Sequence, residues 1–208
     1  MTDERRPYRK RRRAELEAET RRRIAESAVE LHGTVGPSRT SLSAVAERAG
    51  VRRSTLYRHF PDEAALFGAC SAHWLAANPF PDPAGWTAIR DPDRRLAQAL
   101  DELYAYYRQT EQMLANLLRD EHAVPALAQQ LLAFRAYLAG SREILMRGRR
   151  VRGQARKRML AATGHALAFP TWRSLTRDQG LDDHQAVELM CGLVGASSRS
   201  GRRERRET

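Results

Sequence analysis

The sequence predicts an all-α protein built in two parts. Apolar residues recur at the three- and four-residue spacing of helices along almost the whole of the 208-residue chain. No run of alternating or β-branched residues is long enough to predict a strand. The stretch NPFPDPAGW, residues 78–86, holds three prolines and one glycine and interrupts the helical pattern. We therefore expect an N-terminal helical domain, a linker at residues 79–91 and a second helical domain.

The N-terminal domain is expected over residues 14–78, with three core helices and a fourth behind them. The first covers residues 14–31, and HGTVGPS ends it with two glycines and a proline. The second begins at Thr40 or Ser41, whose hydroxyls can accept first-turn N–H groups, and stops at Gly50. The third covers residues 53–59. The fourth covers residues 62–74, where Asp62 and Glu63 suit the positive end of a helix.

The C-terminal domain is expected over residues 92–198. It holds four long amphipathic stretches, at residues 92–120, 124–149, 154–177 and 182–197. Pro170 lies within the third stretch and is expected to kink it, because its ring removes an intrahelical hydrogen bond. Cys70 and Cys191 lie far apart, with no His or Cys at metal-binding spacing. We therefore expect no disulfide, no metal site and no cofactor.

Positive charge gathers at the two ends of the chain. The formal net charge is +11; residues 1–60 carry 15 Lys and Arg against 8 Asp and Glu, and residues 199–208 carry 5 against 2. Clustered arginine favours a polyanionic partner, because it displaces counterions condensed on nucleic acid. The alternative is that the ends are simply solvated. We expect residues 1–13 to be a disordered basic arm and residues 199–208 a disordered basic tail.

Residues 41–60 have the arrangement of a helix-turn-helix. Two short helices meet at Ala49-Gly50-Val51, and Gly50 suits the left-handed backbone of such a turn. Val51, Leu56 and Phe60 can face inward with Leu42 and Val45, which leaves the polar and basic side chains outward: Arg53, Ser54, Tyr57 and Arg58, with His59 at the helix end. Side chains of these kinds contact base edges and phosphates.

Arg52 and Arg53 break a local preference at the start of the third helix. Cations there oppose the helix dipole, and arginine is a poor N-cap. Contact with phosphate or guanine would offset that cost, and such contradictions tend to mark functional sites. The alternative is that both side chains extend into solvent.

Residues 40–67, TSLSAVAERAGVRRSTLYRHFPDEAALF, resemble the DNA-binding signature of the tetracycline-repressor (TetR) family. The turn AERAGV and the helix TLYRHF keep the spacing of that signature without a gap, and the resemblance covers roughly residues 20–70. More weakly, FPTWRSLTRDQGLDDHQAVELMCGLV, residues 169–194, resembles the last two helices of some members.

The resemblance implies roles for single residues. Tyr57 and His59 would hold phosphates, while Arg53, Ser54 and Arg58 would face the major groove. Ser43 would reach a base from the preceding helix, Thr40 would anchor the N-terminus of that helix, and Thr55 sits among them. Two positions depart from the family pattern: Arg52 replaces a frequent capping serine, and Glu63 replaces a frequent phosphate-holding lysine. The expected DNA-binding residues are Thr40, Ser43, Arg52, Arg53, Ser54, Thr55, Tyr57, Arg58 and His59.

The resemblance also implies that the C-terminal domain binds a small-molecule effector and forms a homodimer. For the effector we expect aromatic walls with a few polar tips from three long helices: Tyr104, Tyr107, Phe134, His165 and Trp172. For the dimer interface we expect an apolar stripe on the last helix together with one tryptophan: Trp172, Ala186, Leu189, Met190, Leu193 and Val194. Either set can instead be internal packing of one subunit.

With the resemblance, the expected function is a ligand-responsive transcriptional regulator that binds a near-palindromic double-stranded DNA operator as a homodimer; that it is a repressor is implied by the resemblance alone. We expect no catalytic site, because the motifs of phosphate loops, zinc proteases and serine hydrolases are absent. No run of 18 apolar residues occurs, which favours a cytoplasmic protein without membrane contact. The alternatives are an architectural or effector-independent DNA-binding protein, and a helical enzyme or carrier.

Overall fold

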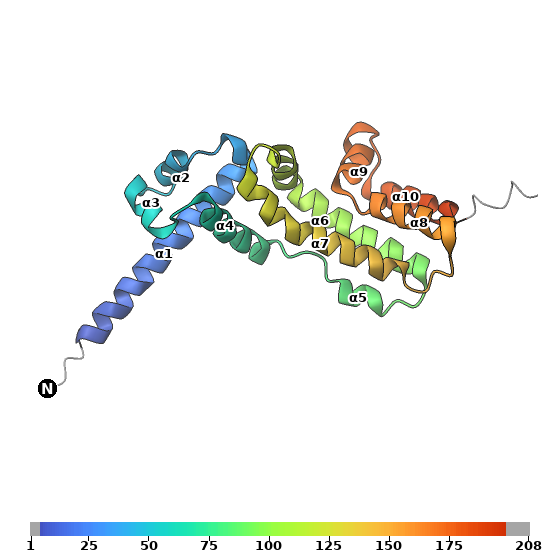
Figure 1. Cartoon of the computed structure of the whole chain (residues 1–208), viewed down its shortest axis with the longest axis horizontal. Helices are drawn as coiled ribbons and strands as arrows, with labels where there is room; N and C mark the ends of the chain where they lie inside the picture. The colour runs from blue at the N-terminus through green and yellow to red at the C-terminus, as the bar shows by residue number, and fades with distance from the viewer. Residues whose placement is uncertain (1–4, 199–208) are drawn as a thin grey trace, which may run out of the picture. The chain divides into compact units, whose positions relative to one another are not determined.

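The computed structural model describes residues 5–198, with side chains from residue 8 onward, and all regular structure within that range is helical (Figure 1). The expected all-α class is confirmed. The chain divides into two compact units: the first takes in the chain up to Pro79 together with Gln112–Leu131, and the second takes in Phe80–Glu111 and the chain from Leu132 onward.

The first unit contains the short helices around the predicted turn. It is built from α1 (Arg5–Thr34), a 3-10 turn η1 (Pro37–Arg39), α2 (Leu42–Arg48), α3 (Arg53–His59) and α4 (Glu63–Ala77). The Ser41 hydroxyl accepts a hydrogen bond from the N–H of Ala44, and Asp62 caps α4 by accepting from the N–H of Ala65. These two caps start α2 and α4 close to where the sequence predicts.

Helix α1 begins earlier than predicted. It is helical from Arg5, so the expectation of a disordered arm is wrong for residues 5–13, and the expected start at residue 14 is too late. Ion pairs one turn apart, Arg11–Glu15 and Arg13–Glu17, stabilise this exposed half of the helix. It extends away from α2, α3 and α4 (Figure 1). Residues 1–4 and the expected basic tail, residues 199–208, lie outside the described residues.

One apolar core holds α1 to α4 together. Ile24 and Ala28 of α1 are fully buried and pack with side chains from the three following helices: Val45, Ala46, Ala49, Leu56, Phe60, Leu66 and Cys70. Helix α3 contributes Leu56 to this core, and Phe60 directly after the helix also belongs to it. Burial of these two side chains determines which face of α3 is exposed.

The C-terminal end of α6 is fastened to the first unit by polar contacts. The amide of Asn116 donates to the carbonyl oxygens of His32 and Gly33, at 3.0 and 2.9 Å, where α1 ends. The carboxylate of Asp120 accepts from the N–H of Ser38 at 3.0 Å. Its hydrogen bonds from Arg119 lower the pKa of Asp120 to about 2. These contacts group residues 112–131 with the first unit.

The second unit contains α5 (Pro83–Thr87), most of α6 (Pro92–Asp120) and of α7 (Pro125–Met146), α8 (Gly153–Ala166), α9 (Phe169–Arg173), a π-helical turn η2 (Ser174–Asp178) and α10 (Asp183–Ser197).

The prediction that Pro170 kinks one continuous helix is wrong. Helix α8 ends at Ala166, and Pro170 stands in the first turn of α9, where a missing N–H leaves no intrahelical bond unmade.

The proline-rich stretch after Pro79 is more structured than a plain linker. Residues 83–87 form α5, and Trp86 within it is buried. The indole N–H of Trp86 donates to a carboxylate oxygen of Glu102 at 2.8 Å, which ties α5 to α6. Cys70 and Cys191 are free thiols.

Candidate nucleic-acid interface and ligand sites

The turn between α2 and α3 has the geometry that the sequence predicts. Gly50 has a φ of 63°, a left-handed conformation that costs a glycine little. The N–H of Val51 donates to the carbonyl oxygen of Ala46 at 2.9 Å and closes the turn. Helix α3 therefore begins in a fixed orientation relative to α2.

Helix α3 exposes the side chains that the sequence places outward. Arg53, Ser54, Tyr57 and Arg58 are exposed, and Arg52 before them is exposed as well. The Arg53 guanidinium donates to the Tyr57 hydroxyl at 3.0 Å and lies 5.5 Å from the centre of its ring. Arg53 and Tyr57 thus form an exposed pair of side chains that offers both hydrogen-bonding groups and a flat ring for stacking.

The cations of α3 are not neutralised within the described residues. No side chain caps the first turn, so Arg52 leaves the positive end of the helix dipole open. Among residues 8–198, Arg52, Arg53 and Arg58 form no ion pair, whereas Arg48 of α2 pairs with Glu30 of α1. The exposed face of α3 therefore carries unpaired positive charge that suits a polyanion.

Arg21 of α1 holds the C-terminal end of α3. Its guanidinium donates to the carbonyl oxygen of His59 and lies 4.2 Å from the centre of the Phe60 ring. Our sequence analysis did not single out Arg21. Its position could have indicated this role, because Arg21 stands one helical turn before the buried Ile24 on the same side of α1.

His59 is less available than the family pattern implies. It is half-buried, and its Nε2 atom is buried without a hydrogen-bond partner. Burial, followed by the nearby charges of Arg58 and Arg21, lowers the pKa of His59, so its ring is neutral at pH 7. A phosphate contact through Nε2 would require the ring to move.

The other candidate DNA-binding residues differ in exposure. Ser43 is exposed on α2, while Thr55 is half-buried on α3. Thr40 is half-buried, and its hydroxyl donates to the carbonyl oxygen of Gly36 at 2.8 Å. Thr40 thus already uses its hydroxyl to fasten the segment that leads into α2.

In the second unit, four of the five expected effector residues come together. Tyr107 packs against Phe134 and Trp172 with ring centres 6.4 and 5.9 Å away, and Tyr104 stacks beside Tyr107 at 6.3 Å. The two tyrosine hydroxyls donate to the carbonyl oxygens of Ala166 and Leu167 at the end of α8, and burial raises the pKa of both. The structure does not bring His165 into this cluster, because its side chain is exposed beside Thr171.

Helix α7 adds polar groups next to these aromatic side chains that our sequence analysis did not single out. Tyr137 stacks on Phe80 with ring centres 4.7 Å apart. The Tyr137 hydroxyl, the Ser141 hydroxyl and the Arg142 Nε are buried, and beyond the contact between Tyr137 and Ser141 themselves none has a hydrogen-bond partner among the described residues. Buried polar groups are normally satisfied, so such a group calls for a ligand or water. Their spacing could have pointed to them, because Tyr137 and Ser141 are four residues apart and therefore lie on the same face of an otherwise apolar helix.

The expected dimer stripe on α10 divides into two faces. Ala186, Met190 and Val194 are buried, and α10 packs on α8. Leu189 and Leu193 are 49% and 45% exposed. Trp172 is buried, and its indole N–H donates to Asp183 at 2.9 Å. In the single chain, only Leu189 and Leu193 of the expected set are large apolar side chains open to a partner.

Two classes of site have no counterpart in the described part of the chain. No helix there is long and apolar enough to span a membrane. No group of three or more His, Cys, Asp or Glu residues is placed to hold a metal ion in the same range.

Comparison with known proteins agrees with this geometry. Residues 24–70 match the model of the tetR family of bacterial regulatory proteins, which confirms the resemblance of the N-terminal domain. That family consists of transcription regulators rather than enzymes. No curated protein matches the sequence.

Two solved structures share the fold over most of the chain. A Clostridium perfringens protein, described as a fatty acid metabolism regulator, has a TM-score of 0.61 at 15% identity, over 83% of this chain and 97% of its own. A protein from Mesorhizobium loti, described as a TetR-family transcriptional regulator, has a TM-score of 0.59 at 18% identity, over 87% of this chain and 96% of its own.

Proposed function

We propose that this chain, whose N-terminal part is a tetR-family domain, is a transcriptional repressor that binds a near-palindromic operator as a homodimer and leaves it when a small molecule binds. It would act in the cytoplasm, on double-stranded DNA. The observation that carries the proposal is the exposed face of α3, with Arg53, Ser54, Tyr57 and Arg58 outward and the arginines unpaired within the described residues.

The chemistry of that face fits DNA in two ways. Unpaired arginines attract the phosphate backbone whatever the sequence. Arginine and serine side chains on an outward helix can also hydrogen-bond base edges in the major groove, and arginine can grip guanine through two hydrogen bonds. Gly50 and the buried Leu56 and Phe60 hold α3 so that this face stays outward.

Dimerisation through α10 is supported by its exposed leucines. Leu189 and Leu193 lie one turn apart on the face of α10 that its own unit leaves open. In a two-fold dimer the same patch on each subunit meets its copy, so two leucines per subunit would be covered at once. Two copies of α3 would then contact successive major grooves, about 34 to 36 Å apart.

The effector would bind in the second unit, beside Phe80 and Tyr137. The buried Tyr137 and Ser141 hydroxyls, which have no partner beyond each other, support this position more strongly than Tyr104 and Tyr107, whose hydroxyls donate to backbone carbonyls. Release of DNA would be a population shift: the effector must bind better to a conformation whose two α3 helices do not match the operator.

The test is a protection experiment with the purified full-length chain on DNA fragments that flank its own gene. We expect a protected, near-palindromic site with two half-sites one helical turn apart, and binding that weakens steeply as salt rises. Binding to all fragments alike would support the architectural alternative, which the helical basic segment of α1 favours. Absence of binding to every fragment would contradict the proposal.

A further inference from the structure

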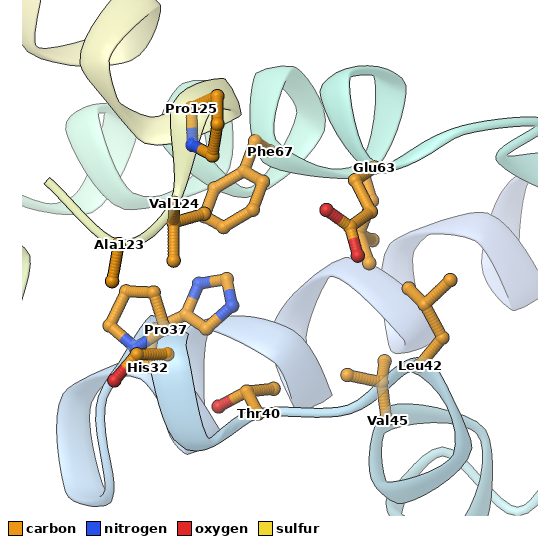
Figure 2. Close-up of a pocket in the computed structure, with 12 residues that line it drawn as sticks. His32, Pro37, Thr40, Leu42, Val45, Glu63, Phe67, Ala123, Val124 and Pro125 are labelled. Carbon is orange, nitrogen blue, oxygen red and sulfur yellow. The ribbon is translucent and has the colours of Figure 1, made fainter. Parts of the chain in front are cut away.

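The first unit contains a cavity of about 270 Å³, separate from the aromatic cluster of the second unit. Its walls come from the end of α1, from η1 and the start of α2, from the first turn and a half of α4, and from the connection between α6 and α7 (Figure 2). Leu42, Val45, Phe67 and Val124 make much of the wall apolar. All of these segments belong to the first unit.

The ring of His32 points into this cavity (Figure 2). The residue is only 5% exposed, and its ring stacks on Phe67 with centres 4.9 Å apart. Neither ring nitrogen forms a hydrogen bond within residues 8–198. Burial, partly offset by the charge of Asp120, lowers the pKa of His32 to about 4. At pH 7 the ring is neutral and offers the cavity one donor and one acceptor.

Glu63 enters the same cavity from the opposite wall. Its carboxylate points toward the space in front of His32 (Figure 2). Among the described side chains it forms no ion pair or hydrogen bond, and it is exposed to solvent. Glu63 is also the residue that departs from the lysine often found there in the resembling family. The other carboxylate near His32, Asp120, is already paired with Arg119.

We infer that this cavity binds a small organic amine in its protonated form. The ammonium group would donate hydrogen bonds to the Glu63 carboxylate and to the acceptor nitrogen of His32, which both face the same space. The apolar body of the ligand would rest against Phe67, Leu42 and Val124. Carboxylates only accept hydrogen bonds, so Glu63 selects a donor and repels an anion. The cavity is slightly below the range of drug-sized pockets, which favours a compact ligand.

Such a ligand would contact the helix-turn-helix directly. Thr40, Leu42 and Val45 line the cavity. Thr40 lies in the segment that leads into α2, and Leu42 and Val45 lie in the first turns of that helix. The amine would therefore act on α2 and α3 without passing through the second unit. This regulatory consequence rests on the proposed DNA-binding function, whereas binding of the amine does not.

The test is calorimetric titration of the full-length chain with three probes of the same shape: benzylammonium, benzyl alcohol and benzoate. We expect benzylammonium to bind at one site per chain, benzyl alcohol about fivefold more weakly, and benzoate not at all. Glu63→Gln should remove the preference of benzylammonium over benzyl alcohol. His32→Phe should weaken benzylammonium about tenfold, and His32→Gln, which retains an acceptor, should recover part of the loss.

The controls separate this cavity from other sites. Glu47→Gln makes the same charge change on an exposed position of α2 outside the cavity, so probe binding should stay unchanged. Val124→Phe should abolish binding by filling the cavity. Equal affinity for the three probes, or a Glu63→Gln chain that keeps the ammonium preference, would overturn the proposal. Circular dichroism of each variant verifies that it is folded.

A second measurement addresses regulation. On a DNA fragment that the chain protects, benzylammonium should change the affinity of the wild-type chain and leave that of Glu63→Gln unchanged. Binding of the amine without any change in DNA affinity would overturn the regulatory consequence alone. If no DNA is bound at all, the proposed function fails while the calorimetric result still decides the cavity.

Discussion

Helices α3 and α10 each bury one face against their own unit, but their exposed faces have opposite chemistry. On α3 the outward residues are arginines, a serine and a tyrosine, and on α10 the large outward apolar side chains are Leu189 and Leu193. The buried faces resemble each other: Leu56 of α3 and Phe60 directly after it, and Met190 and Val194 of α10, are all core side chains.

The difference shows which face of a helix carries information about partners. The buried side chains account for how each helix is held, and they would look alike in a protein with no partner. An outward cation without a counterion indicates a polyanion, while an outward pair of leucines indicates an apolar surface such as a second copy of the chain. The following predictions test this contrast.

The largest effect is expected from Leu193→Arg. If α10 meets its copy across a two-fold axis, the substitution buries two like charges without partners, which costs about 3 to 5 kcal/mol of association free energy. The dimer should dissociate and operator affinity should collapse. In the single chain Leu193 is 45% exposed, so the arginine can be solvated and the helical content should stay near wild type. Sedimentation and circular dichroism test both expectations.

Leu132→Arg provides the matched control for that substitution. Leu132 on α7 is 49% exposed, much as Leu193 is, but it lies outside the proposed interface. This variant should remain dimeric. A dimeric Leu193→Arg chain would show that the exposed leucines of α10 are not the interface.

The next effect is a loss of stability in mild acid that is confined to the first unit. The pKa of His32 is about 4 in the folded chain and near 6.5 when unfolded, so the unfolded state binds protons more readily. The contribution of the neutral His32 ring to the free energy of unfolding is therefore fully present above pH 6.5. It falls by up to about 3 kcal/mol as the pH drops toward 4. The lowered pKa of His59 acts in the same direction.

Hydrogen exchange at pH 7 and pH 5, corrected for intrinsic rates, measures this loss. Amides of α1 to α4 should lose protection while those of α8 to α10 retain it. His32→Phe should flatten the change, because most of the titration depends on that ring. Equal loss in both units would mean that buried histidines do not distinguish them.

A smaller effect is expected from Arg53→Ala. The side chain is outward at the start of α3, where a base contact is worth about 1 to 3 kcal/mol of discrimination. Operator binding should weaken while binding to random DNA changes little. Competition titrations with operator and random fragments measure the ratio, and equal weakening on both would assign Arg53 to phosphate.

The smallest effect is expected from Tyr57→Phe. A phosphate hydrogen bond carries no sequence information, so affinity for operator and random DNA should fall alike, by about 1 kcal/mol. The substitution also removes the hydroxyl that accepts from Arg53. A changed base preference in the same competition titrations would show that Tyr57 acts by positioning Arg53.

Much of the first unit could be predicted from the sequence, because local signals there agree. Ser41, Gly50 and Asp62 mark helix ends through their own side-chain or backbone chemistry, and α3 has the predicted bounds. The prediction failed in two places where the local sequence argued against a helix that the structure contains. The charge of residues 5–13 suggested disorder, but ion pairs stabilise a helix there. The prolines around Trp86 suggested a linker without regular structure, but the stretch also holds α5, whose buried indole donates to Glu102.

The cavity and the grouping of residues 112–131 depend on distant contacts that no local pattern records. His32 and Glu63 are 31 positions apart, and each alone looks like an ordinary helix residue. Likewise, nothing in the amphipathic pattern of residues 92–120 separates Asn116, which binds the end of α1, from its neighbours. On α10, helical spacing alone could not divide the apolar stripe into the side chains that α8 covers and those left exposed.

The missing N-cap of α3 has a consequence for the thermodynamics of DNA binding. A seven-residue helix is too short to be stable alone, and no side chain satisfies the N–H groups of its first turn. A phosphate oxygen can accept from those groups, so in the proposed complex the DNA would supply the cap that the chain itself lacks. In the proposed complex, part of the binding enthalpy would come from hydrogen bonds to these N–H groups, and part of the entropic cost from the ordering of the exposed Arg52 and Arg53 side chains. Affinity for a DNA site would then depend on how well its phosphates are placed to cap the first turn of α3.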